Sequence, residues 1–199
     1  DKVHLVPFGE YVPFGSILPL RRLTYGAADL SAGHERPAIR VGSLPVVAPM
    51  ICYESIFPFH GLDGDPPHWL LNVTNDAWFG RSAGPFQHLE IARFRAVEAG
   101  APMIRVANTG ISAMIDAFGR VRERIELEQT AILDVELPRR LPGATIYSRL
   151  GSTPLLVAIT LIFLAAATRK LLPGEAGAGG KNIHQAAHGR GGADALRRP

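Results

Sequence analysis

The chain of 199 residues has a single cysteine, Cys52. One thiol cannot form an internal disulfide, and without a second cysteine or a histidine at ligand spacing it does not build a structural zinc site. We therefore expect neither a metal nor a cofactor. Two interpretations of Cys52 remain open: a buried apolar side chain, which is the usual role of a lone cysteine, or a nucleophile.

The sequence also lacks a basic region outside its C-terminus. The formal net charge is +3, and residues 169–199 alone carry +4. Because the whole excess lies in this final segment, the rest of the chain offers no electrostatic footprint for DNA or RNA. We expect no nucleic-acid partner.

Charged side chains are absent from residues 150–168, which lie between Arg149 and the pair Arg169–Lys170. As a helix, this stretch would extend about 28 Å, close to the ~30 Å hydrocarbon core of a bilayer. It is apolar on all sides, which favours a membrane helix over the alternative, a buried core helix. The sequence predicts a transmembrane helix at 150–172, followed by a Gly/Ala-rich, disordered cytoplasmic tail at 173–199.

Residues 1–149 show the alternation of strand and helix patterns that is typical of an α/β domain. Pro85 in the first turn and Gly100 after the last turn mark the bounds of an amphipathic helix. The predicted elements are strands at 46–51, 68–74, 103–107, 111–116 and 131–135, and a helix at 85–99. We expect a sheet that is built partly from hairpins.

Cys52 follows an apolar strand at the point where a short helix begins. The free N–H groups and the dipole of a helix start favour a thiolate and can hold an oxyanion. Lys2 and Glu10 flank a Pro- and Gly-containing segment; the lysine is suited to stabilise negative charge, and Glu10 to orient the ammonium. A surface ion pair is the alternative for these two residues. The seven histidines form no Cys-His-Asn pattern, so we do not expect a papain-like triad.

Five segments of the chain, in order, resemble the apolipoprotein N-acyltransferases of the nitrilase, or carbon–nitrogen hydrolase, superfamily. The resemblance covers roughly residues 1–170, and five successive motifs make it specific. The segments are the lysine motif at 1–13, Met50-Ile51-Cys52-Tyr53-Glu54, residues 71–89, residues 105–112 and residues 144–151.

The resemblance implies the second half of a nitrilase-type α-β-β-α sandwich, followed by one C-terminal transmembrane helix. Residues 1–149 would be the C-terminal part of the catalytic domain, 150–172 the membrane helix and 173–199 the tail. It also implies an enzyme of the bacterial inner membrane whose catalytic domain faces the periplasm.

The reaction implied by the resemblance is acyl transfer in two steps. The cysteine takes an acyl chain from a phospholipid as a thioester, and the N-terminal amine of a diacylglyceryl apolipoprotein receives it. The implied site comprises Cys52 as nucleophile, Lys2 as oxyanion donor, Glu10 as support, Tyr53 and Glu54 at the elbow, and Asn75, Trp78 and Phe79 on a mobile substrate loop. For Trp78 and Phe79, the alternative is an ordinary place in the core.

The family's general-base glutamate precedes the lysine motif, whereas this sequence starts at Asp1 with the motif already under way. We therefore expect a fragment that lacks the upstream half and is inactive alone. Two alternative functions remain. One is a membrane-anchored carbon–nitrogen hydrolase, an amidase in which water resolves the thioester. The other is an inactive membrane-tethered remnant.

Overall fold

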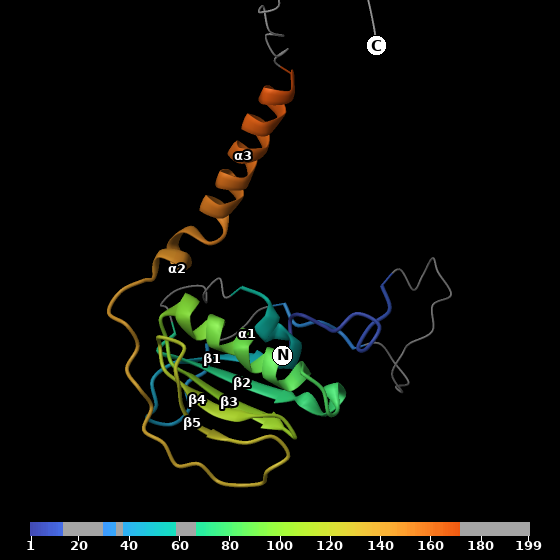
Figure 1. Ribbon diagram of the computed structural model, residues 1–199. Coiled ribbons are helices and arrows are strands. Elements are labelled where there is room, and N and C mark those ends of the chain that lie inside the picture. Colours follow the sequence, from blue (N-terminus) through green and yellow to red (C-terminus); the bar gives the residue numbers. More distant parts are fainter. Residues whose placement is uncertain (14–29, 35–37, 59–66, 172–199) are drawn as a thin grey trace, which may run out of the picture. The chain divides into compact units, whose positions relative to one another are not determined.

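The computed structural model describes residues 1–13, 30–34, 38–58 and 67–171 (Figure 1). The chain divides into two compact units, Asp1–Pro154 and Leu155–Pro199. The predicted disordered tail at 173–199 lies outside the described residues.

The first unit is built on a five-stranded mixed sheet with the strand order β1-β2-β3-β4-β5. The first three strands are parallel to one another, and the last two continue the sheet as antiparallel neighbours. The strands are β1 (Val47–Ile51), β2 (Trp69–Asn75), β3 (Met103–Asn108), β4 (Ser112–Ile115) and β5 (Val121–Ile125). The helix α1 (Gly84–Ala99) makes the crossover that parallel strands require and lies across one face of the sheet in Figure 1.

Alanines allow α1 to lie close to the sheet. Ala92 and Ala96 are fully buried and share one core cluster with Met50, Leu70 and Met103 from the parallel strands. The helix has a proline in its first turn, and it ends at Gly100, whose φ of 61° is the left-handed conformation that glycine adopts without strain. The sequence prediction for this helix and for the first four strands is confirmed to within two residues.

The predicted strand at 131–135 is wrong, and β5 (Val121–Ile125) was missed. The tight turn at 116–120, in which Gly119 N–H donates to the Asp116 carbonyl, brings the next residues directly beside β4. This places β5 at the edge of the sheet. Charged side chains such as Arg122 and Arg124 are tolerated there because they are exposed to solvent. Residues 131–135 have no strand to pair with, and Ile132 is 91% exposed.

The parallel strands determine where the functional residues gather. The chain leaves β1 and β2 at the same edge of the sheet, and it continues from each strand into a short 3₁₀ helix: Cys52–Ile56 (η1) after β1 and Asp76–Phe79 (η2) after β2. β3 ends beside them, with Asn75 paired to Asn108. In open α/β sheets this carboxyl edge is where ligands bind.

After the short helix α2 (Ile146–Leu150), the chain forms α3 (Thr153–Leu171). Large apolar side chains of α3 are exposed on all its sides, as the values of 72% for Phe163 and 61% for Leu156 illustrate. Across the described part of the chain, no helix has the combined length and hydropathy needed to cross a membrane.

Candidate active site around Cys52

Cys52 has a strained backbone. Its φ of 52° lies in the left-handed region, which costs a residue with a Cβ about 1–2 kcal/mol. Such strain persists only where the surrounding structure holds it, and it is concentrated at functional sites. The Cys52 side chain is partly exposed, and its backbone carbonyl accepts a hydrogen bond from Ser55 Oγ at 3.1 Å. The bend therefore presents a thiol at the edge of the sheet.

Glu54 connects this bend to the N-terminal segment. Its carboxylate is buried, with 1% of the residue exposed. Oε2 accepts a hydrogen bond from Ile51 N–H at 2.7 Å, and Oε1 accepts from Val3 N–H at 2.6 Å and His4 N–H at 3.2 Å. One side chain thus fixes both the residue before Cys52 and the two residues after Lys2.

Lys2 and Glu10 form a tight ion pair in the same segment. Both carboxylate oxygens of Glu10 lie 2.7 Å from Lys2 Nζ, and Oε2 also accepts from Val6 N–H at 2.8 Å. The two side chains are only 12% and 25% exposed. This burial distinguishes the pair from an ordinary surface ion pair, which is exposed and screened by water.

An apolar cavity of about 400 Å³ adjoins Tyr53 on one side and the segment after Lys2 on the other. Phe57 forms part of its wall, with the His4 ring stacked on it at 4.2 Å and the Tyr53 ring edge-on at 5.2 Å. The lining residues are Val3, His4, Leu5, Pro7, Tyr11, Leu30, Ala32, Tyr53 and Phe57. The space beside Tyr53, the residue that follows Cys52, is therefore suited to an apolar group.

Asn75 is the last residue of β2, and Trp78 and Phe79 follow it in the short helix η2, where the sequence predicted a loop. Asn75 Oδ1 shapes the start of η2 by accepting hydrogen bonds from Ala77 N–H at 3.2 Å and Asn108 Nδ2 at 3.0 Å. Trp78 is 70% exposed and Phe79 42%, so the alternative that both belong to the core is wrong. The Phe79 ring keeps one contact inward, edge-on to His88 at 5.6 Å.

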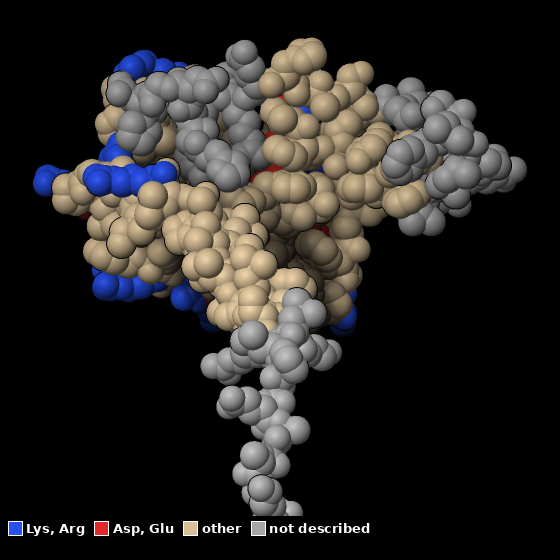
Figure 2. All heavy atoms as spheres, turned by 90° about the horizontal axis from the view of Figure 1, so that it is seen from above, with Lys and Arg blue, Asp and Glu red and all other residues tan. Residues whose placement is uncertain are grey.

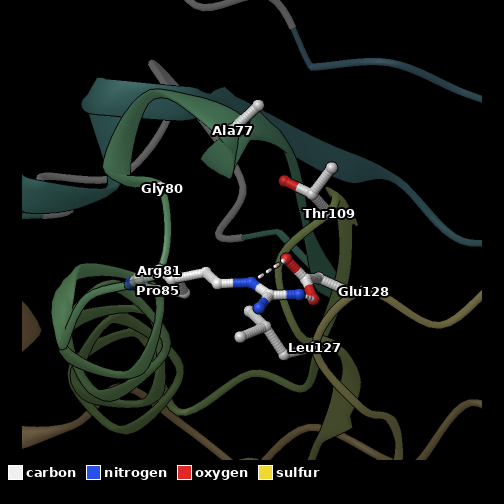
Figure 3. A pocket seen from close by; sticks show the side chains of 7 residues that line it. All are labelled: Ala77, Gly80, Arg81, Pro85, Thr109, Leu127 and Glu128. Atoms are coloured by element: carbon white, nitrogen blue, oxygen red, sulfur yellow. Dashed lines mark hydrogen bonds and ion pairs between the residues drawn. The ribbon is translucent and has the colours of Figure 1, made fainter.

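A smaller cavity of about 160 Å³ lies beside η2 (Figure 3). In the close-up, Arg81 extends across it toward Glu128, and Arg81 Nη2 lies 3.0 Å from Glu128 Oε2. Thr109 and Glu128, both with positive φ, belong to the opposite wall, where Glu128 N–H donates to the Thr109 carbonyl at 3.0 Å. Neither Cys52 nor its neighbour Tyr53 lines this cavity, and we assign it no part in the chemistry.

Behind Cys52 lies a buried polar network that sequence reasoning missed. Ser55 Oγ is 2.7 Å from His88 Nε2, and His88 Nδ1 is 2.9 Å from Asp76 Oδ1. Arg105 Nη2 donates to Asp76 Oδ2 at 2.6 Å, and Arg105 Nη1 donates to Asn72 Oδ1. Asn72 Nδ2 in turn donates to the Met50 carbonyl at 3.1 Å. All five residues are less than 5% exposed.

The signal for this network was present in the sequence. Arg105 lies two residues after Met103 in an apolar strand, so its side chain points to the same buried face. A charged group at such a position requires a buried partner, because an unpaired charge in the interior is prohibitively costly. Asp76, at the end of the neighbouring strand, supplies that partner.

The charges in the network depend on one another. Burial opposes ionisation of Asp76, but the hydrogen bond with His88 and the charge of Arg105 outweigh it and hold the pKa of Asp76 below its ordinary value. Burial lowers the pKa of Arg105, against the opposing influence of Asp76 and, to a smaller extent, of Cys52. The nucleophile candidate is therefore within electrostatic reach of the guanidinium.

The carboxylates of this region are largely enclosed. On the face shown in Figure 2, lysine and arginine side chains gather at the margin, and acidic atoms are visible only in recesses between uncharged ones. Glu54 and Asp76, at 1% exposure each, agree with that picture. Among the described residues, no group of three or more His, Cys, Asp or Glu side chains is arranged to hold a metal ion.

We predict that Asp76→Asn destabilises the protein at pH 7 by about 3–5 kcal/mol, because it leaves the buried Arg105 charge without its counter-ion. Since the pKa of Asp76 is depressed in the folded state, its contribution is complete above about pH 4 and is lost as the pH falls through the folded value. The deficit of the variant should therefore shrink at pH 3. Urea unfolding of the full chain at both pH values measures this, with the exposed Glu128→Gln as control. An equal deficit at pH 7 and pH 3 would contradict the assignment.

Comparisons with known proteins place these features in a family. The family model "Carbon-nitrogen hydrolase" matches residues 1–147. The chain is 45% identical over 175 residues to an apolipoprotein N-acyltransferase of Bradyrhizobium diazoefficiens, covering 86% of this chain and 32% of that protein. It is 44% identical over 164 residues to the enzyme of the same name from Rickettsia prowazekii, covering 82% and 33%.

A solved CN-hydrolase superfamily protein from Xanthomonas campestris is 26% identical, with a TM-score of 0.45 over 65% of this chain and 48% of that one. The chain spans about a third of the length of the curated relatives that it matches. Since the family model covers the sheet, the Lys2 segment and the Cys52 bend together, the chain belongs to the carbon–nitrogen hydrolase family and has its nitrilase-type α/β fold with a mixed sheet.

Proposed function

We propose that this chain is the C-terminal part of an apolipoprotein N-acyltransferase in which Cys52 is the acyl-carrying nucleophile. The observation that carries the proposal is the bridge made by Glu54, which holds the Lys2–Glu10 segment against the Cys52 bend. Such a bridge supports a site in which a cation and a thiol act together, as acyl transfer through a thioester requires. The 45% identity to a relative bearing that name supports the choice of acyl transfer.

The proposed first step forms a thioester. The Cys52 thiolate attacks an ester carbonyl of a phospholipid, and the negative charge of the tetrahedral intermediate is held by Lys2. The intermediate collapses with loss of the lysophospholipid alkoxide, which takes up a proton and leaves as an alcohol. We propose that Glu10 keeps the Lys2 ammonium oriented and that the general base comes from a part of the protein outside this chain.

The proposed second step forms an amide. The N-terminal amine of an S-diacylglyceryl apolipoprotein attacks the thioester carbonyl, the C–S bond breaks, and the amine proton returns to the thiol. The apolar cavity beside Tyr53 offers room for the acyl chain. Trp78 and Phe79, exposed on η2, are available to contact a lipid substrate.

An amidase in which water resolves the thioester is the second candidate, because the family model itself is that of carbon–nitrogen hydrolases. The two functions differ in the acceptor. A purified full-length protein that transfers acyl chains to a diacylglyceryl peptide and does not hydrolyse simple amides supports the acyltransferase. The opposite result would support the amidase, and no thioester at all would support an inactive remnant.

We predict that Cys52→Ala abolishes the covalent acyl-enzyme in the full-length protein, because the variant has no group that can carry the acyl chain. Incubation with phospholipid and intact-mass spectrometry would show the added mass of one acyl chain in the wild type and none in the variant. Phe118→Ala, at an exposed turn away from Cys52, serves as control and should acylate normally. Acyl transfer by Cys52→Ala at the wild-type rate would exclude the mechanism.

A second prediction concerns Lys2. Lys2→Met removes the charge but keeps much of the apolar stem, and loss of an oxyanion donor costs on the order of 3–4 kcal/mol, or about 10²–10³ in acylation rate. Single-turnover acylation measures the rate, and a thermal melt reports stability. Arg81→Met is the matched control, since it breaks an exposed ion pair and should leave acylation unchanged. If both variants acylate like the wild type, Lys2 has no catalytic role.

We further propose that residues 150–172 attach the protein to the bacterial inner membrane as a transmembrane helix, with residues 1–149 on the periplasmic side and 173–199 in the cytoplasm. Residues 150–168 carry no charge, and the apolar side chains of α3 are exposed on all sides, an arrangement that is unfavourable in water. A substrate pair of phospholipid and lipoprotein also requires access to a lipid surface.

This topology predicts which cysteines an impermeant maleimide reaches in spheroplasts. In the full-length protein carrying Cys52→Ala, a cysteine introduced as Ala83→Cys should be labelled in intact spheroplasts. A cysteine introduced as Gly177→Cys should be labelled only after lysis. Lysed samples of both variants provide the control for reactivity. Labelling of Gly177→Cys alone before lysis would reverse the orientation, and labelling of both would exclude a membrane-spanning segment between them.

A further inference from the structure

The buried network behind Cys52 has a geometry that its burial alone does not explain. Its two ends reach backbone carbonyls on either side of Ile51: Asn72 donates to the Met50 carbonyl, and Ser55 donates to the Cys52 carbonyl. Between these ends, Arg105, Asp76 and His88 form a continuous chain of hydrogen bonds. The network therefore closes a loop around the residue that precedes the nucleophile candidate.

The distances within Ser55, His88 and Asp76 are those of a nucleophilic triad, 2.7 Å and 2.9 Å. Ser55 is nevertheless not placed to attack a substrate, because it is 0% exposed and its hydroxyl faces the Cys52 carbonyl. What the arrangement can do is fix the direction of one hydroxyl group. Ser55 is hydrogen-bonded to His88, His88 to Asp76, and Asp76 to Arg105, so each side chain restrains the next.

Each member of this chain comes from a different element. Ser55 belongs to η1, Asp76 to η2, His88 to α1 and Arg105 to β3. The position of the bend is thereby tied to η2, to the helix α1 and to the strand β3 at once. Gly110 packs closely against Asp76, since a Cβ at Gly110 would overlap the Asp76 carboxylate.

We propose that Ser55, His88, Asp76 and Arg105 are positioning residues that hold Cys52 in its strained, reactive backbone conformation. A residue with φ of 52° relaxes to negative φ unless its peptide groups are held, and the hydrogen bond from Ser55 acts directly on the Cys52 carbonyl. The inference rests on the proposed role of Cys52 as nucleophile, but not on the identity of the acyl donor or acceptor.

Ser55→Ala tests the proposal most directly, because it removes the hydroxyl and changes little else. In the full-length protein we expect single-turnover acylation to slow by about 10–100-fold with little change in the concentration of phospholipid at half-saturation. Alkylation of Cys52 by iodoacetamide should also slow, because a relaxed backbone no longer aims the thiol at the open site. Ser112→Ala is the matched control: it removes a hydroxyl that accepts from Ala107 N–H, and it lies in β4, which is separated from β1 by two strands of the sheet.

Thermal melts separate positioning from general stabilisation. Both serine variants should lose a similar few degrees, and only Ser55→Ala should lose reactivity. If Ser55→Ala does not fold, His88→Gln takes its place, and we expect the same loss of acylation. In a folded double variant, Ser55→Ala and His88→Gln should together slow acylation no more than the larger single effect, because they interrupt one chain.

A folded Ser55→Ala or His88→Gln variant that acylates and alkylates at the rate of Ser112→Ala would overturn the proposal. The alkylation experiment also keeps it separate from the proposed function. If the wild-type protein transfers no acyl chain, the acyltransferase assignment fails, and the alkylation rates still decide whether the network controls the reactivity of Cys52.

Discussion

The ion pair between Arg105 and Asp76 is the interaction on which the site depends. Both side chains are fully enclosed, and Arg105 Nη2 lies 2.6 Å from Asp76 Oδ2. Two buried charges are tolerated only with close pairing and with hydrogen bonds to their remaining atoms. Thr74 and His88 supply further hydrogen bonds to the Asp76 carboxylate. Asn72 and the Ile111 carbonyl accept the other hydrogen bonds of the Arg105 guanidinium. Satisfying one pair of charges thus fixes the ends of β2 and β3 and the helix α1 relative to one another.

The N-terminal segment is held by a second carboxylate. Glu54 accepts from the backbone of Val3 and His4, whereas the carboxylate of Asp76 pairs with side chains among the described residues. Backbone N–H groups are available whatever the side chains are, so the position of the segment depends on Glu54 and leaves Lys2 free to pair with Glu10. Asp76 therefore connects the sheet to the region around Cys52, and Glu54 connects that region to the segment that carries Lys2.

The sequence was sufficient for the parts of this arrangement that depend on local pattern. Apolar runs located the parallel strands, Pro85 and Gly100 bounded α1, and the end of a strand located the Cys52 bend. It was insufficient where one residue serves several distant partners. Arg105 donates hydrogen bonds to Asn72, Asp76 and the Ile111 carbonyl. These contacts depend on strand order and register, which no local sequence pattern specifies. β5 was missed for a related reason, because its charged residues satisfy an edge position that only the completed sheet defines.

The two sides of Cys52 differ in rigidity and in polarity. Behind the bend, the side-chain polar groups of Asp76 and Arg105 are hydrogen-bonded within the fold, which restricts the movement of the backbone around Cys52. In front, the cavity beside Tyr53 and Phe57 is largely apolar, and Trp78 is exposed on η2. A thioester at such a site would meet few groups that can hold a water molecule, since an ordered water needs two or more polar partners. Such a shortage supports the proposed acyl transfer, because a thioester that hydrolyses slowly leaves time for an amine to attack it.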